Sequence, residues 1–169
     1  KNAAFFKHQR FVDSTPVAVD VKIDGAWKTL LIGGVGKGGK GYYAIDITSP
    51  AGITSEATAA AKVLWEFTDA DMGYTFGKPL IGKTYADNTW VAFLPAGYNN
   101  SSGKGKLFVV RLSDGHLLRT LETSAGTATD PSGLTQVSGF VLSYKNQFIE
   151  QIYGGDLLGN VWRFDVSSA

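Results

Sequence analysis

Cysteine is absent from this 169-residue sequence, which excludes a disulfide scaffold and any metal site built on thiolate ligands. Histidine is scarce as well: the chain has two, and we expect His116 at a solvated strand edge and His8 in a loop. The sequence has neither an H-E-x-x-H nor a G-x-S-x-G pattern, so nothing marks a zinc protease or a serine hydrolase. We therefore expect no catalytic, cofactor-binding or metal-binding residues.

No charge of either sign dominates the chain. Lys and Arg number 16 against 15 Asp and Glu, which gives a net charge of +1. Nucleic-acid-binding domains usually gather a basic excess on one face, so we expect no nucleic-acid partner. No uninterrupted apolar run approaches the ~20 residues of a transmembrane helix, so we expect no membrane span in this segment.

Glycine is abundant, with 21 residues scattered between short apolar runs and without a G-x-y period. Apolar and polar residues often alternate within these runs, which is typical of β-strands joined by tight turns. The strand-like runs are 16–21, 27–34, 41–47 and 62–67, then 79–82, 90–97, 106–112 and 116–121, and finally 139–142, 148–155 and 159–166. The stretch 51–61 is the only helix-permissive piece.

These runs fall into three units of one plan, at about residues 12–67, 76–122 and 136–166. Four-stranded units that recur every ~40–50 residues predict the blades of a β-propeller, with a β-sandwich as the competing all-β architecture. Propellers close with roughly 4 to 8 blades, so about three blades predict part of a larger propeller. We therefore expect residues 1–169 to be a propeller segment and a fragment of a longer protein.

Two local patterns invite a functional interpretation that their context does not support. The loop 34–41 satisfies G-x-G-x-x-G and the first seven positions of a P-loop, but both motifs work by opening a helix that holds phosphate. This loop instead enters a strand-like run, and Gly41 stands where magnesium binding needs Ser or Thr. The pair Asp69 and Asp71 is too short a series for a calcium loop, so a turn is expected.

Several stretches in series resemble the C-terminal propeller of the type IV pilus-associated PilC/PilY family. They are 12–16, 31–34, 43–48, 63–67, the segment D-M-G-Y-T-F-G-K-P at 71–79, G-Y-N at 97–99, and Y-G-G-D-L-L-G-N-V-W-R-F-D at 153–165. The resemblance reaches from about residue 8 to residue 166. The family's propeller is similar to that of quinoproteins, whose G-x-L-x-A-L-D repeat style is matched by residues 41–46.

The resemblance implies an exported bacterial protein at the cell surface, the pilus tip or the outer membrane. It would support pilus biogenesis, attachment and twitching motility without catalysis, with minor pilins and the pilus fibre as partners and a host-cell or abiotic surface as a further one. The repeat style leaves an alternative from another class, a quinone-dependent dehydrogenase propeller.

Members of the resembled family commonly carry an Asp-rich calcium loop before their Y-x-G-D segment. By resemblance its ligand positions fall on Leu142, Tyr144, Asn146, Phe148 and Glu150, of which only Asn146 and Glu150 offer the oxygen ligands expected there. The loop is degenerate at 142–150, so we expect no calcium and no other cofactor. From the strand pattern at 161–164 we also expect a further residue, Trp162, to be buried.

Overall fold

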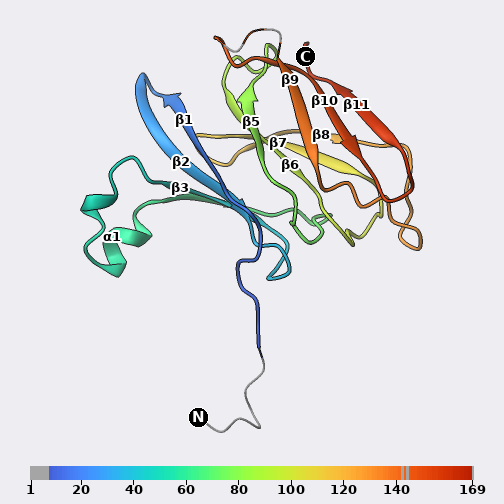
Figure 1. Cartoon of the computed structure of the whole chain (residues 1–169), viewed down its shortest axis with the longest axis horizontal. Helices are drawn as coiled ribbons and strands as arrows, with labels where there is room; N and C mark the ends of the chain where they lie inside the picture. Colours follow the sequence, from blue (N-terminus) through green and yellow to red (C-terminus); the bar gives the residue numbers. More distant parts are fainter. Residues whose placement is uncertain (1–7, 142, 144, 169) are drawn as a thin grey trace, which may run out of the picture.

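The computed structural model describes residues 8–168, apart from residues 142 and 144. Strands account for 44% of the described residues and helix for 5%. The described strands form three antiparallel sheets that follow one another along the sequence and open like a fan (Figure 1). Sheet 1 contains β1 (Val17–Ile23), β2 (Ala26–Gly34), β3 (Tyr42–Asp46) and β4 (Val63–Phe67); sheet 2 contains β5 (Leu80–Lys83), β6 (Trp90–Pro95), β7 (Lys106–Arg111) and β8 (Leu117–Glu122); sheet 3 contains β9 (Val137–Val141), β10 (Ile149–Gly155) and β11 (Val161–Asp165).

Each sheet is an up-and-down meander in which every strand pairs with its neighbour in sequence. Left-handed residues make the tight turns possible: Asp24 and Gly25 between β1 and β2 have φ of 50° and 80°, and Asn88 between β5 and β6 has φ of 47°. Gly115 turns the chain between β7 and β8 with φ of 73°. Successive meanders of this kind are propeller blades, so the predicted all-β propeller class is confirmed and a sandwich is not found.

Sheet 2 lies between the other two sheets, and its two inner strands, β6 and β7, are buried on both faces. Because side chains alternate along β6, Ala92 and Leu94 join the core shared with sheet 1, while Val91 and Phe93 join the core shared with sheet 3. Every residue of β6 is buried for this reason.

Hydrogen bonds from two aromatic side chains also cross from sheet 1 to sheet 2. The Tyr42 hydroxyl donates to the Pro95 carbonyl at 2.8 Å, and the Trp65 indole donates to the Leu112 carbonyl at 2.8 Å. Both donors are buried, so these bonds satisfy groups that would otherwise be desolvated without a partner. They fix how the two sheets are placed against each other.

The helix-permissive stretch is an insert between β3 and β4. It contains the short 3₁₀ helix η2 (Pro50–Gly52) and α1 (Glu56–Ala60), which lie away from the sheets in Figure 1. Ser55 caps α1, because its hydroxyl accepts from the Thr58 amide while the Thr58 hydroxyl accepts from the Ser55 amide. In the part of the chain that the structure describes, no helix is long and apolar enough to cross a membrane.

The expectation of a buried Trp162 is wrong in degree. This side chain is only partly buried, because β11 is an edge strand of sheet 3 and the residues on both sides, Val161 and Arg163, are exposed. The local alternation of residue types correctly predicts the strand. That local pattern does not tell whether another strand pairs with the outer edge of β11, and none of the described strands does.

Candidate functional site

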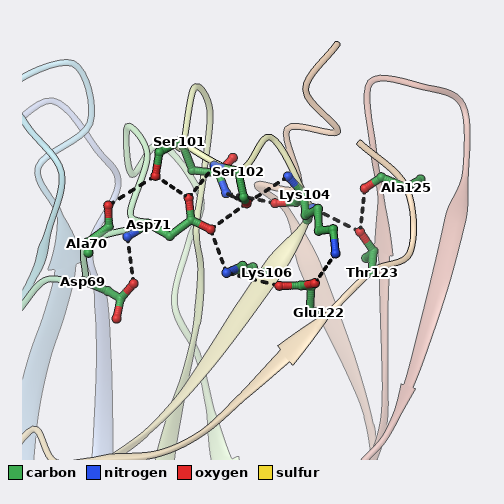
Figure 2. A network of polar contacts seen from close by, with 12 residues as sticks. Asp69, Ala70, Asp71, Ser101, Ser102, Lys104, Lys106, Glu122, Thr123 and Ala125 are labelled. Atoms are coloured by element: carbon green, nitrogen blue, oxygen red, sulfur yellow. Dashed lines mark hydrogen bonds and ion pairs between the residues drawn. The ribbon is translucent and has the colours of Figure 1, made fainter. Parts of the chain in front are cut away.

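A polar network joins the segment after β4 to the loop between β6 and β7 (Figure 2). Its centre is Asp71, whose carboxylate accepts from the amide and hydroxyl of Ser102 at 2.7 and 2.6 Å and from the Ser101 hydroxyl at 2.8 Å. The Asp69 side chain accepts from the Asp71 amide at 2.8 Å, which makes the predicted turn. The predicted turn is confirmed, and it places the Asp71 side chain beside Ser101 and Ser102, about thirty positions later in the chain.

Lysines neutralise the charge of this network. Lys106 lies 2.7 Å from Asp71 and 3.1 Å from Glu122, and Lys104 lies 2.6 Å from Glu122. Burial alone would raise the pKa of Asp71, but the hydrogen bonds from Lys106 and the two serines outweigh it and hold that pKa well below its usual range. The hydrogen bond to Asp71 correspondingly raises the pKa of Lys106. A cationic side chain therefore already occupies the position beside Asp71.

The segment D-M-G-Y-T-F-G-K-P at 71–79 connects sheet 1 to sheet 2 and is tightly packed. Thr75 is fully buried; its hydroxyl donates to the Gly41 carbonyl and accepts from the Val35 amide. A Cβ atom on Gly73 would overlap the Tyr98 carbonyl, and one on Gly77 would overlap the Thr135 carbonyl. These glycines are needed because the backbones of neighbouring segments approach so closely.

Asp156, in the turn between β10 and β11, organises the segment 153–165, which also carries the family resemblance. Its carboxylate accepts from the Asn160 amide and side chain at 2.8 and 3.0 Å, from the Trp162 indole at 2.8 Å and from the Ser132 hydroxyl at 2.9 Å. Burial alone would raise the pKa of Asp156, yet the bonds from Asn160, Trp162 and Ser132 lower it from 3.8 to about 2. Both aspartates therefore hold the fold together.

The residues that suggested chemistry are not gathered into a site. His8 and His116 are exposed, as expected. The glycine-rich loop forms a turn in which Gly36 pairs with Thr75, and it leads into β3 rather than a helix. Over residues 8–168 without 142 and 144, no group of three or more His, Cys, Asp or Glu side chains could hold a metal ion.

The predicted degenerate calcium loop is described only in part, because Leu142 and Tyr144 lie outside the described residues. Asn146 is exposed, and its side-chain oxygen accepts from the Phe148 amide at 3.3 Å. Glu150 is half-buried in β10. The absence of calcium at this loop stays a prediction.

An open groove of about 890 Å³ runs along the β1–β2 hairpin, the β5–β6 hairpin and the turn before β10. Its lining residues are Val19, Asp20, Lys22, Trp27, Lys28, Thr29, Thr48, Lys83, Trp90, Lys145, Asn146 and Gln147. The Lys83 ammonium lies 5.1 Å from the centre of the Trp90 ring and 5.6 Å from that of Phe148, within cation–π range. This groove is a candidate binding site.

The sequence analysis did not identify this groove. Its signal lies in the repeat: each unit has a lysine close to its first hairpin turn, namely Lys22, Lys83 and Lys145. Because equivalent turns of successive blades lie at the same end of a propeller, three such lysines are brought to one end. Each lysine taken alone looks like an ordinary solvated charge.

The fold is that of a β-propeller segment, and the segments 71–79 and 153–165 stabilise contacts between its blades. A family model described as the PilY1 beta-propeller domain matches residues 3–169, and the chain belongs to this family. The predicted resemblance is thereby confirmed.

Individual relatives agree with the family match. The chain is 37% identical over 162 residues to the type IV pilus biogenesis factor PilY1 of Pseudomonas aeruginosa strain UCBPP-PA14, covering 94% of this chain and 13% of that protein. It is 36% identical over 174 residues to a type IV pilus biogenesis factor PilY1 homolog of Xylella fastidiosa, covering 96% and 11%. These relatives are named as biogenesis factors, so they do not favour the quinone-dependent dehydrogenase.

A solved structure supports the same assignment. The crystal structure of the Pseudomonas aeruginosa PilY1 C-terminal domain superposes with a TM-score of 0.78 at 34% identity, covering 92% of this chain and 30% of that one. The chain thus spans 11–13% of the length of the curated relatives described above.

Proposed function

We propose that this chain is a propeller segment of a type IV pilus biogenesis factor, exported and displayed at the cell surface, the pilus tip or the outer membrane. The observation that carries the proposal is the identity of 36–37% to type IV pilus biogenesis factors, sustained over 94–96% of the chain. The segment acts without catalysis. It presents surfaces to minor pilins and the pilus fibre, and it supports attachment to host cells or abiotic surfaces and twitching motility.

The packing of the described residues suits a protein that must keep its shape while a fibre is assembled or pulled. The inner strands β6 and β7 of sheet 2 are buried on both faces, and the Asp71 and Asp156 networks tie loops from different sheets together. Because interiors packed in this way transmit strain and deform little, the propeller would keep its exposed loops in fixed positions while a fibre is assembled or pulled.

Two measurements on the source bacterium test the placement and the partners. Gold-labelled antibodies against the protein should bind intact cells at pilus ends or at the outer surface, and minor pilins should co-purify with the full-length protein after mild cross-linking. A protein found only inside the cell, with no pilin attached, would contradict the proposal.

A further inference from the structure

The groove along the first hairpins carries an excess of positive charge. Four lysines line it against one aspartate, Asp20, which already accepts a hydrogen bond of 2.7 Å from the Thr29 hydroxyl. Lys28 lies 3.7 Å from Asp46. Lys22 and Lys145 are exposed, and no carboxylate of the described residues lies within ion-pair distance of either. An anionic occupant would therefore be attracted to this groove.

Flat aromatic surface lies beside these charges. Trp27 lines the groove, is 65% exposed, and stands directly opposite Lys22 in the β1–β2 register, so the two side chains project from one face of the hairpin. Near the Lys83 side of the groove, Tyr85 is 50% exposed and stacks on Phe148 with ring centres 4.3 Å apart. The exposed Trp27 ring therefore gives the groove an apolar surface beside its lysines.

An acidic sugar unit fits this combination of groups. A uronic acid ring has an apolar C–H face that can lie on an indole, a carboxylate that pairs with lysine, and hydroxyls that bond to Thr48 or Asn146. The groove is open rather than closed, which suits an extended polymer passing several such units along it. An acidic peptide would match the lysines but would leave Trp27 without a complementary flat partner.

We propose that the groove binds an acidic polysaccharide, with Lys22 and Lys145 pairing to its carboxylates and Trp27 carrying a sugar ring. The proposal deepens, and rests on, the attachment part of the proposed function, because it names the class of surface polymer that the propeller would contact. The electrostatic attraction between the groove and the polysaccharide should weaken as the salt concentration rises, because the lysines are exposed.

The test is a calorimetric titration of the full-length protein with polygalacturonate oligomers. We expect binding that falls at least about tenfold in the double variant Lys22→Gln with Lys145→Gln, and by a similar factor in Trp27→Ala. Lys37→Gln is the matched control, because Lys37 is also exposed but lies in the loop between β2 and β3, at the opposite end of these strands. This control should bind like the unaltered protein.

Neutral dextran and poly-glutamate of similar length complete the design. Dextran should bind weakly or not at all. If poly-glutamate bound as tightly as polygalacturonate and Trp27→Ala left that binding unchanged, the ligand would be an acidic peptide and the proposal would be wrong. The proposal would also be wrong if polygalacturonate did not bind, or if the groove variants bound it as tightly as the unaltered protein. All three side chains are exposed, so the variants should melt like the unaltered protein. Pilus numbers should stay normal in the groove variants, which separates failure here from failure of the pilus assignment.

Discussion

Lys106 of β7 lies 2.7 Å from Asp71, so a strand of sheet 2 is tied to the segment that leaves sheet 1. The two side chains are 17% and 13% exposed, which makes this pair far better shielded than the Arg10–Asp13 pair at 47% and 43%. Shielding matters because exposed ion pairs contribute little to stability, whereas breaking a buried one leaves a charge without its partner.

Replacing Asp71 by Asn should therefore destabilise the protein by about 2–3 kcal/mol. The substitution removes the charge that Lys106 and the two serines contact, while the side-chain shape is nearly kept. Urea unfolding measures the effect. Glu122→Gln is the matched comparison: its side chain is 39% exposed, so losing its charge should destabilise the protein clearly less than Asp71→Asn does. Equal costs for the two variants would contradict the central position given to Asp71.

The lowered pKa of Asp156 predicts how the free energy of unfolding depends on pH. Its pKa is about 2 in the folded protein against an ordinary value of 3.8, so folding favours the ionised form. The stabilisation is complete above about pH 4 and is lost as the pH falls through about 2. Asp156→Asn should flatten this part of the dependence, as measured by urea unfolding between pH 2 and pH 6. An unchanged slope between the two proteins would show that the Asn160, Trp162 and Ser132 contacts do not stabilise the carboxylate.

Gly77→Ala should be strongly destabilising, by about 3 kcal/mol or more, because the new methyl group would overlap the Thr135 carbonyl. Gly52→Ala is the matched control. Nothing lies within 4 Å of a Cβ at Gly52, so that variant should unfold within about 0.5 kcal/mol of the original. Thermal unfolding followed by circular dichroism compares the two. A well-tolerated Gly77→Ala would mean that the connector is looser than its packing indicates.

The loop at 142–150 should not bind calcium at physiological concentration. Glu150 is its single carboxylate, and Lys145 adds a repelling charge, while calcium sites need six to eight oxygen ligands with several carboxylates among them. A calorimetric titration with calcium measures this directly. Micromolar binding that is abolished by Glu150→Ala would contradict the prediction.

The strands were predictable because their information is local. The continuous apolar run at 90–97 and a turn at Asp114 and Gly115 are enough to place β6 and the β7–β8 hairpin. The Asp71 network was not predictable, because its partners lie about thirty residues away and only the blade arrangement brings them together. The groove was missed for the same reason: Lys22 and Lys145 become neighbours of one groove only through the repeat of the fold.

The central claim is that this chain belongs to a factor needed for pilus assembly. Counting surface pili by electron microscopy in the source bacterium tests it most directly, using a deletion strain complemented with the unaltered gene, with Gly52→Ala or with Gly77→Ala. We predict few or no pili in the deletion strain and with Gly77→Ala, and normal numbers with the unaltered gene and with Gly52→Ala. A deletion strain that assembles pili in normal numbers would contradict the claim.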